Sequence, residues 1–388
     1  IAMICALKEK NITNVILPKQ NAKEASIIDG MNIYPAVNLM HVVKMLRGET
    51  EMSEYKENCG HQKYGKYSEY KEYYADIIGN ASLKRFLTIA AAGRHSVLLI
   101  GSPGVGKTMA LTRFPSIFPE LTKEEQIECM KIANIADKNN EFKLIKYPPM
   151  RSPHYSITQS GLIGGGVPPK PGEITRSHNG ILYLDELTEF SRKYIDLLRT
   201  PIEQKKITLS RGTKSWTYPA DFQLVCSMNP CPCGNHGNIS KECTCSASEI
   251  RRYLNRISRP FLDRIDIRWE MTTGIFNENN SDKKIINSSI MKDKVCNARK
   301  IQKSRYSGKK YRYNSEIPDS VSYRDIGISD KEHKLLVKIS EKYGFSVRGM
   351  RKSALIARTI ADIENMHSVS EEHILEAVQY RIAVRKYW

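Results

Sequence analysis

The chain has 388 residues, 40% hydrophobic and 26% charged, a composition typical of a globular protein with two or three domains. No apolar run reaches the roughly 18 residues that a membrane span needs, which excludes a membrane-spanning protein. The formal net charge is +18, from 60 Lys and Arg against 42 Asp and Glu. This excess favours a polyanionic partner such as nucleic acid, although a lysine-rich composition with solvated faces would give the same charge.

The first part of the chain, residues 1–47, alternates strand-like and helical segments. Val15–Pro18 reads as a strand and Asn38–Leu46 as an amphipathic helix. Because the chain opens on Ile1 and not on Met, we expect the beginning of this domain to be missing. Residues 48–75 are rich in Glu, Lys, Tyr and Gly with few aliphatic side chains, which predicts a linker.

Residues 76–275 alternate strand and helix signals. Ser96–Ile100, Gly180–Leu184 and Phe222–Met228 are nearly continuous apolar runs, as a buried parallel sheet requires. Residues 276–388 lack such runs and have helical periodicity. The sequence therefore predicts an α/β fold, with a parallel sheet flanked by helices and a separate helical part at residues 276–388.

A phosphate-binding loop follows the first of these strands and precedes a helical segment. Its residues are Gly101, Ser102, Pro103, Gly104, Val105, Gly106, Lys107 and Thr108. The glycines let backbone N–H groups surround a polyphosphate. Lys107 is expected to reach the β- and γ-phosphates, and the Thr108 hydroxyl to bind Mg²⁺. The chain is therefore predicted to bind ATP.

Two carboxylates end the second strand. Asp185 is placed to hold Mg²⁺, and Glu186 to polarise the water that attacks the γ-phosphate. Asn229, at the end of the third strand, is expected to reach the γ-phosphate or that water from the side. Water as the nucleophile implies hydrolysis rather than transfer to an acceptor.

Taken together, the motifs resemble those of AAA+ ATPases of the magnesium-chelatase-like branch, and most of all the ComM (YifB) family. The resemblance rests on the phosphate loop and on Asn179–Phe190, Met228–Gly234, Leu262–Asp266, Ser346–Arg348 and Ala357–Asp362. It covers almost the whole chain. Residues 1–47 resemble the end of that family's amino-terminal Lon-protease-like domain, most of which would be absent here.

The resemblance implies roles for two arginines. Arg264 would be an arginine finger delivered to the ATP of a neighbouring subunit, and Arg348 the second sensor on the helical lid. From the residues alone, Arg264 could instead form a surface salt bridge with Asp263 or Asp266. The family also implies a homo-oligomeric ring, most simply a hexamer.

Two inserted segments could grip a phosphate backbone without reading sequence. Gly161–Gly172 is rich in Gly and Pro and is expected to be a loop that does not pack, which the resemblance places toward the pore of the ring. Lys205–Tyr218 reads as a hairpin with a basic tip at Arg211 and Lys214. A plain surface hairpin remains the alternative.

Four cysteines form two closely spaced pairs. Cys231 with Cys233 and Cys243 with Cys245 could supply the four thiolates of a structural Zn²⁺ site. Reduced free thiols or disulfides are the alternatives. A nucleotide-binding enzyme is normally cytosolic, which makes disulfides the weaker of the two and predicts a cytoplasmic protein.

The resemblance implies an ATP-hydrolysing ring motor on single-stranded or branched DNA, a helicase that promotes branch migration during natural transformation. One alternative is a chelatase-type motor subunit that remodels a protein partner. Another is a remnant of a Lon-like protease, for which the chain offers no assignable Ser–Lys pair.

Overall fold

The computed structural model describes residues 1–55, 73–77, 79–136, 144–238, 240–271, 286–384 and 387–388. The chain divides into two compact units. Unit 1 comprises residues 1–69 and 122–146, and unit 2 comprises residues 70–121 and 147–388. Most of the predicted linker, residues 56–72, lies outside the described residues, as does the expected boundary between the core and the lid near residue 275.

Unit 1 is a small α/β unit around a two-stranded parallel sheet. Its elements are α1 (Ala2–Glu9), β1 (Asn14–Pro18), α2 (Ala22–Ala25), β2 (Asn32–Ala36), α3 (Leu39–Leu46) and α6 (Lys123–Ala136). Its core is formed by small and aliphatic side chains, among them Ile4, Ala25 and Ile33. Helix α6 joins this core through Ile127, and the Asn134 amide donates to Glu24 at 2.6 Å.

Unit 2 is built on a five-stranded, all-parallel sheet with strand order β11-β3-β10-β7-β4. These strands are β3 (Val97–Gly101), β4 (Met150–Arg151), β7 (Ile181–Leu184), β10 (Gln223–Met228) and β11 (Ile267–Met271). The three strands predicted from apolar runs are the central β3, β10 and β7. The predicted α/β fold with a parallel sheet is confirmed.

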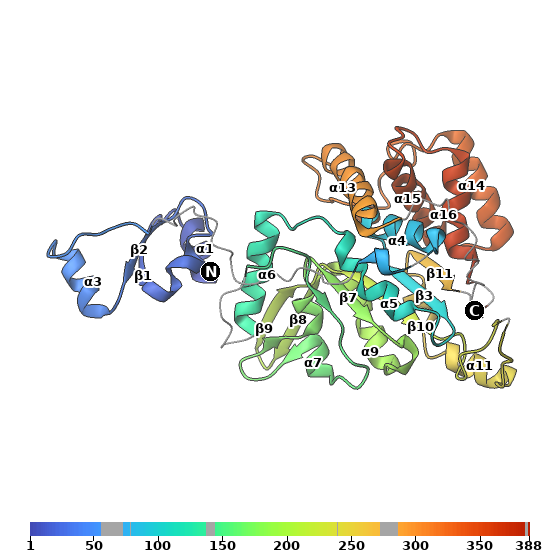
Figure 1. The fold of residues 1–388 in the computed structure, drawn as a ribbon, viewed down its shortest axis with the longest axis horizontal. Helices are drawn as coiled ribbons and strands as arrows, with labels where there is room; N and C mark the ends of the chain where they lie inside the picture. The colour runs from blue at the N-terminus through green and yellow to red at the C-terminus, as the bar shows by residue number, and fades with distance from the viewer. Residues whose placement is uncertain (56–72, 78, 137–143, 239, 272–285, 385–386) are drawn as a thin grey trace. The chain divides into compact units, whose positions relative to one another are not determined.

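Helices cover both faces of this sheet (Figure 1). They are α4 (Ala81–Gly93), α5 (Lys107–Thr112), α7 (Gln159–Ile163), α8 (Glu173–Arg176), α9 (Arg192–Leu197), α10 (Arg199–Gln204), α11 (Ala247–Leu254), α12 (Arg259–Leu262), α13 (Ser288–Arg305), α14 (Asp330–Tyr343), α15 (Val347–Ile363) and α16 (Glu371–Ile382). Strand β3 shows why both faces need cover, because all five of its residues are buried. Val97 and Leu99 enter one core with α4, α13 and α15, whereas Leu98 and Ile100 enter a second core with α8, α9 and α12.

The C-terminal helices are joined by a buried polar cluster. Asp362 of α15, fully buried, accepts hydrogen bonds from Arg358 at 2.9 and 3.1 Å and from Arg305 of α13 at 2.5 and 3.0 Å. The Asn314 amide donates to the same carboxylate at 2.9 Å. This cluster fixes α13 against α15, since a buried carboxylate is stable only with such partners.

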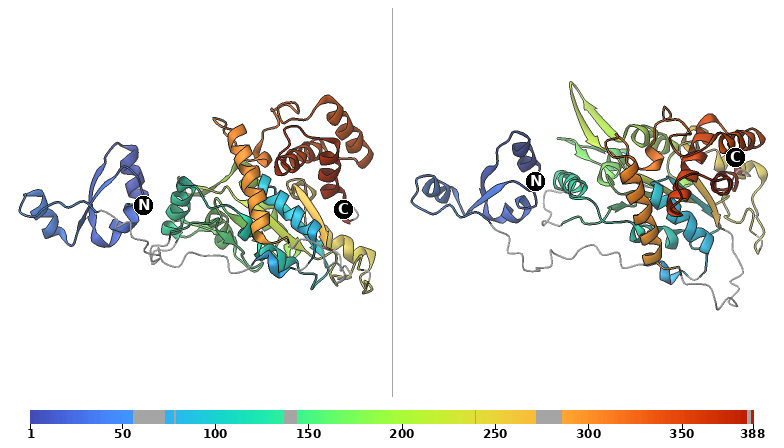
Figure 2. Two further views of the ribbon diagram at one scale, coloured as in Figure 1. Left: turned by 45° about the horizontal axis from the view of Figure 1, so that its top comes forward. Right: turned by 90° about the horizontal axis from the view of Figure 1, so that it is seen from above.

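The predicted hairpin is present as β8 (Lys206–Arg211) and β9 (Lys214–Pro219), paired antiparallel. Figure 2 shows it, in yellow-green, extending away from the five-stranded sheet. The expectation that Gly161–Gly172 does not pack is wrong. The segment includes the end of α7 and the short pair β5 (Gly164–Gly165) and β6 (Lys170–Pro171). Leu162 is buried in the second core, to which the hairpin strand residue Ile207 also belongs.

No helix among the described residues combines the length and the apolar character that crossing a membrane requires.

Candidate functional site

The phosphate loop connects the carboxyl end of β3 to the start of α5. Gly104 and Gly106 have φ of +81° and +89°, a left-handed conformation that side-chain-bearing residues rarely adopt. Gly101 is needed for a different reason: a Cβ there would lie 2.7 Å from the Met271 carbonyl oxygen. The loop geometry that sequence predicts therefore depends on these glycines.

Lys107 points its ammonium group into this loop. Its Nζ donates to the carbonyl oxygens of Gly101 at 2.6 Å and Ser102 at 3.0 Å, and to Oδ1 of Asn229 at 3.0 Å. Burial lowers the pKa of Lys107 to about 8, while the negative charges of Asp185 and Glu186 act to raise it. The hydrogen bonds of this buried ammonium group go to carbonyl oxygens, which carry no full negative charge. A bound anion such as a phosphate would therefore stabilise it.

Asp185 lies beside the start of α5. Its Oδ2 accepts a hydrogen bond from the Thr108 hydroxyl at 3.0 Å, and its Oδ1 accepts from the Ser227 hydroxyl of β10. The two oxygens that were expected to bind Mg²⁺, from Thr108 and Asp185, are thus adjacent. Oxygen donors of this kind suit a hard cation such as Mg²⁺.

Glu186 is exposed and has a left-handed backbone, with φ of +51°. That conformation is costly for a residue with a side chain, and its backbone N–H is held by Oδ1 of Asp185 at 3.0 Å. Glu186 and Asn229 line one cavity of about 460 Å³. The carboxylate expected to act on water therefore faces an open space beside the residue expected to sense the phosphate.

Further residues of this cavity were missed by sequence reasoning. Glu249, Arg252, Tyr253 and Arg256 line it from α11 and the turn that follows. Arg256 donates to the Thr188 carbonyl oxygen at 3.1 Å. The sequence feature that could have identified these residues is the amphipathic segment Ala-Ser-Glu-Ile-Arg-Arg-Tyr-Leu. It follows the second cysteine pair and the capping residue Ser246, and so predicts a helix.

The structure does not bring Arg264 and Arg348 to the phosphate loop of their own chain. Ser96, the residue before β3, donates to the Arg264 carbonyl oxygen at 3.0 Å, which places Arg264 at the amino end of β3. The phosphate loop leaves the opposite end, about 16 Å away for a strand rise of about 3.3 Å per residue. Both arginines instead bind Oε1 of Glu203 in α10, Arg264 at 2.8 Å and Arg348 at 3.2 Å.

Within one chain Arg264 does form a salt bridge, as the alternative interpretation predicted, but its partner is Glu203 and not Asp263 or Asp266. Asp266 pairs with Lys352 at 2.6 Å. The partner Glu203 precedes the hairpin in sequence and could not be identified from residues near Arg264.

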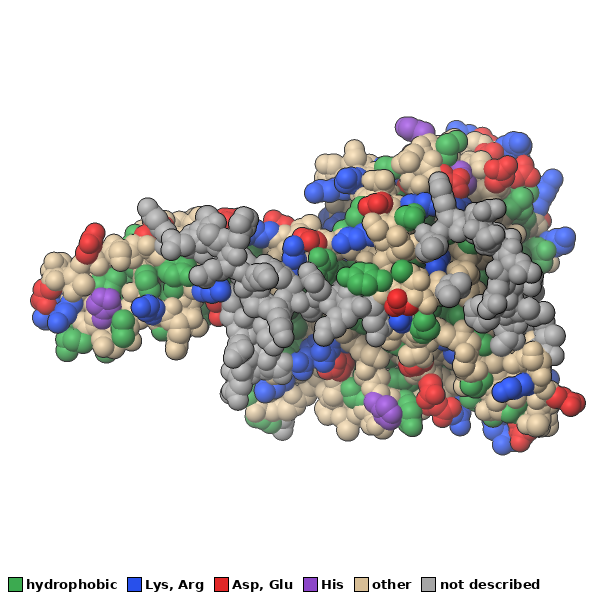
Figure 3. Space-filling model, viewed as in Figure 1, with side chains coloured by type: hydrophobic (Ala, Val, Ile, Leu, Met, Phe, Trp, Pro, Cys, Tyr) green, Lys and Arg blue, Asp and Glu red, His purple; other side chains and the backbone are tan. Residues whose placement is uncertain are grey.

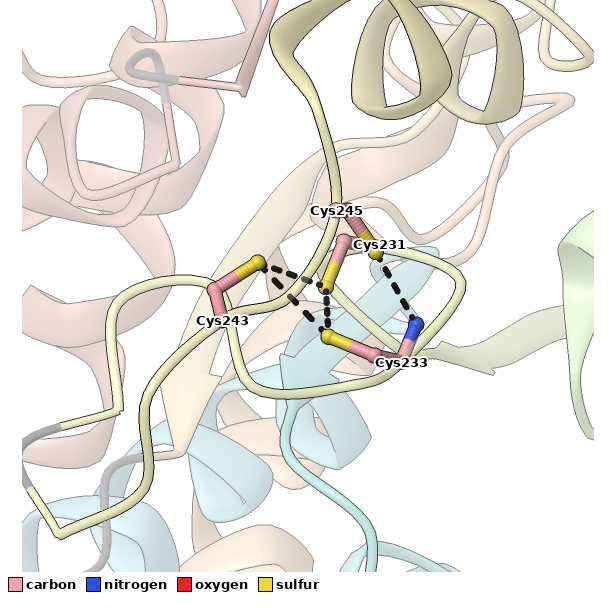
Figure 4. Close-up of side chains that lie close together, drawn as sticks. All are labelled: Cys231, Cys233, Cys243 and Cys245. Atoms are coloured by element: carbon pink, nitrogen blue, oxygen red, sulfur yellow. Dashed lines mark hydrogen bonds between the residues drawn. The ribbon is translucent and has the colours of Figure 1, made fainter.

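The four predicted cysteines converge on one point (Figure 4). The sulfurs of Cys231, Cys233 and Cys243 are 3.4, 3.7 and 3.6 Å apart, and all four sulfurs lie within 4.8 Å of one another. Four sulfurs around Zn²⁺ at about 2.3 Å would be about 3.8 Å apart. The Cys233 N–H donates to the Cys245 sulfur and the His236 N–H to the Cys231 sulfur, both at 3.3 Å.

These thiols are electrostatically unequal. Backbone N–H groups near Asn235 and Thr244 lower the pKa of Cys233 to about 5, against the effect of partial burial. A thiolate is the form that binds metal. The donor set, its spacing and its N–H···S hydrogen bonds fit a closed tetrahedral site.

The residues proposed to touch DNA lie at the hairpin tip. Arg211 pairs in register with Lys214 across a two-residue turn, and Lys214 is exposed. The side chain of Arg211 lies outside what the structure describes. On the face of unit 2 in Figure 3, basic side chains are interspersed with acidic ones and do not gather in one patch.

Comparisons with known proteins agree with this architecture. Residues 73–278 match the family model for magnesium chelatase subunit ChlI, and residues 286–381 match its C-terminal model. The chain is 38% identical to competence protein ComM of Haemophilus influenzae over 99% of this chain and 74% of that protein. It is 36% identical to the uncharacterized protein YifB of Escherichia coli over 96% and 72%. The magnesium-chelatase 38 kDa subunit of Cereibacter sphaeroides is 24% identical over 40% and 52%.

Proposed function

This chain belongs to the magnesium-chelatase ChlI-like AAA+ family that includes ComM and YifB, and from this premise we propose that it hydrolyses ATP to drive movement on DNA. The reaction proposed is a helicase activity that promotes branch migration of single-stranded or branched DNA, as in recombination during natural transformation. Support for the DNA process comes from the ComM relative and from the net charge of +18. The protein would act in the cytoplasm.

One observation carries the ATPase proposal: five residues that follow three neighbouring strands meet around the phosphate loop. Lys107 binds Asn229, Thr108 binds Asp185, and Glu186 shares a cavity with Asn229. Lys107 would hold the β- and γ-phosphates, Thr108 and Asp185 the Mg²⁺, and Glu186 the attacking water. Bound Mg²⁺ would neutralise charge on the phosphates.

An oligomeric ring, most simply a hexamer, completes the proposal. Arg264 lies at the end of β3 remote from its own phosphate loop, which supports a contact with the ATP of a neighbouring subunit rather than with its own. Its Nε is buried without a hydrogen-bond partner among the described residues. Arg264 as a finger and Arg348 as a sensor would both serve the adjacent subunit.

The cofactors proposed are ATP with Mg²⁺ at the phosphate loop and a structural Zn²⁺ at the four cysteines. Sulfur separations close to a tetrahedral edge support the zinc.

A first experiment separates binding from turnover. Binding of a fluorescent ATP analogue and phosphate release are measured for Lys107→Ala and Glu186→Gln. Lys107→Ala should lose nucleotide affinity, because the cation is removed. Glu186→Gln should bind normally and stop hydrolysis, because only the carboxylate that polarises water changes. Equal loss of affinity in both variants would contradict these roles.

A second experiment tests the DNA partner. Arg211 and Lys214 are changed together to Ala, and the matched control changes Lys8 and Lys10 of unit 1 to Ala, which removes the same charge. The hairpin variant should weaken DNA binding and DNA-stimulated hydrolysis while leaving basal hydrolysis near normal. The affinity of the wild-type protein for DNA should fall steeply as the salt concentration rises and should not depend on the DNA sequence. If both variants weaken DNA binding equally, the net charge of the protein and not the hairpin tip explains the binding.

The alternative is a chelatase-type motor that remodels a protein partner, favoured by the ChlI family match. It predicts ATP hydrolysis that DNA does not stimulate. The same hydrolysis assay, with and without DNA, therefore decides between the two.

A further inference from the structure

The segment that carries the four cysteines also touches the nucleotide site. We define the cysteine loop as residues 230–245, which run from Asn229 at the end of β10 to Ser246, the residue that caps α11. Asn229 binds Lys107, and α11 contributes Arg252 to the cavity that contains Glu186. Both ends of the loop are thus parts of the site.

The middle of the cysteine loop lies directly on the phosphate loop. Gly234 has φ of +81°, and a Cβ there would lie 2.3 Å from Cδ and 2.7 Å from Cγ of Pro103. The Asn238 amide donates to the Ser102 hydroxyl at 3.1 Å. Two consecutive residues of the phosphate loop are therefore held from one side by this loop.

Contacts other than those of the cysteines, such as the Ser240 N–H to Asn238 Oδ1 hydrogen bond and the packing of His236 on Tyr387, do little to join the two halves of the cysteine loop. Its described residues form no helix or strand, and the apolar side chains they offer besides the cysteines are those of Pro230, which is buried where the loop leaves β10, and Pro232, which is exposed. The Gly234 N–H to Cys231 carbonyl oxygen hydrogen bond at 3.0 Å closes a turn within the first half. The Asn235 amide reaches the Glu242 carbonyl oxygen of the second half at 3.5 Å, the outer limit of a hydrogen bond, and such a contact alone does not hold the two halves together. The convergence of Cys231 and Cys233 with Cys243 and Cys245 does link them.

We infer that Zn²⁺ bound by the four cysteines makes the cysteine loop a brace for the phosphate loop, so that the metal sets the affinity for nucleotide. Zinc closes a polar loop of 16 residues that has no core of its own. Closure fixes Gly234 against Pro103 and Asn238 against Ser102, and so keeps the phosphate-binding N–H groups in place. The expected effect on nucleotide affinity rests on the proposed nucleotide binding. The contact between the cysteine loop and the phosphate loop does not depend on that proposal.

The experiment uses the full chain and three measurements: zinc by elemental analysis, amide hydrogen exchange over residues 101–108, and affinity for a fluorescent ATP analogue. Wild type should contain about one zinc per chain. Cys243→Ser with Cys245→Ser should lose the zinc, exchange faster in the phosphate loop and bind nucleotide about tenfold or more weakly. Cys296→Ser, on α13, is the matched cysteine control and should change none of these.

A second pair of variants tests the contact without removing metal. Gly234→Ala places a methyl group against Pro103 and should weaken nucleotide binding while retaining zinc. Gly308→Ala is its control, because Gly308 has a similar φ of +74° and nothing within 4 Å of its Cβ position. It therefore imposes the same backbone strain away from the site and should leave binding unchanged.

The outcomes separate the claims. Absence of zinc from freshly reduced wild type would overturn the metal site. Zinc that can be removed with no change in exchange over residues 101–108 would overturn the brace. If exchange responds to zinc but no variant, including wild type, binds nucleotide, the brace stands and the proposed ATPase function fails.

Discussion

Replacing Asp362 by Asn tests whether the C-terminal helices depend on the buried charge cluster. Asp362 is fully buried and pairs with Arg358, whose side chain is 1% exposed, and with Arg305, whose side chain is 25% exposed. Asn keeps the size of the side chain but leaves two guanidinium groups without a counter-charge. Breaking a buried ion pair from one side costs about 3–5 kcal/mol, and that is the loss expected in the free energy of unfolding.

The measurement is urea denaturation followed by tryptophan fluorescence, since Trp216, Trp269 and Trp388 all belong to unit 2. The matched control is Asp330→Asn, which breaks the exposed pair between Asp330 and Arg324, whose side chains are 65% and 75% exposed. That change should cost less than about 1 kcal/mol. If Asp362→Asn shifts the midpoint no more than the control does, the cluster does not hold these helices together and the reasoning fails.

Two further predictions concern charges elsewhere in unit 2. Burial alone would raise the pKa of Asp221, but Arg94, Lys205 and Arg312 lower it from 3.8 to about 2. A lowered pKa contributes stability above the unfolded value that is lost as pH falls, so wild type should exceed Asp221→Asn by about 2 kcal/mol near neutral pH. The gap should close between about pH 4 and 2, and a gap independent of pH in acid denaturation would refute the assignment. Glu203→Gln weakens the contacts that hold Arg264 and Arg348 in their own chain, so ATP hydrolysis by the assembled protein should rise a few-fold, about 1 kcal/mol. A loss as large as that of Arg264→Ala would show instead that Glu203 positions the finger.

The central sheet and the phosphate loop could be predicted from sequence because their signals are local. A buried parallel strand needs an apolar run, and β3, β7 and β10 each provide one. Strand β11 was not identified, since Arg268 and Glu270 interrupt its apolar pattern. They are tolerated because β11 is the edge strand beside β3.

The contacts that connect distant segments could not be predicted. Glu203 meets Arg264 and Arg348 only because α10, the turn before β11 and α15 converge in the fold. The contact of Gly234 with Pro103 likewise joins residues 131 positions apart in number (234 minus 103). Spacing indicated that four cysteines could share a metal, but nothing in their spacing indicated what the loop would rest on.

Helix α6 has a consequence for the order in which this protein is made. The chain crosses between the two units three times, at residues 69/70, 121/122 and 146/147. Ile127 and Asn134 of α6 complete the first unit, so that unit cannot close on the ribosome until the phosphate loop has already been synthesised. Expression of unit 2 as a single uninterrupted segment starting at residue 70 would carry α6 along without its partners. A clean dissection must delete residues 122–146 and rejoin the flanks, or express both units in one polypeptide.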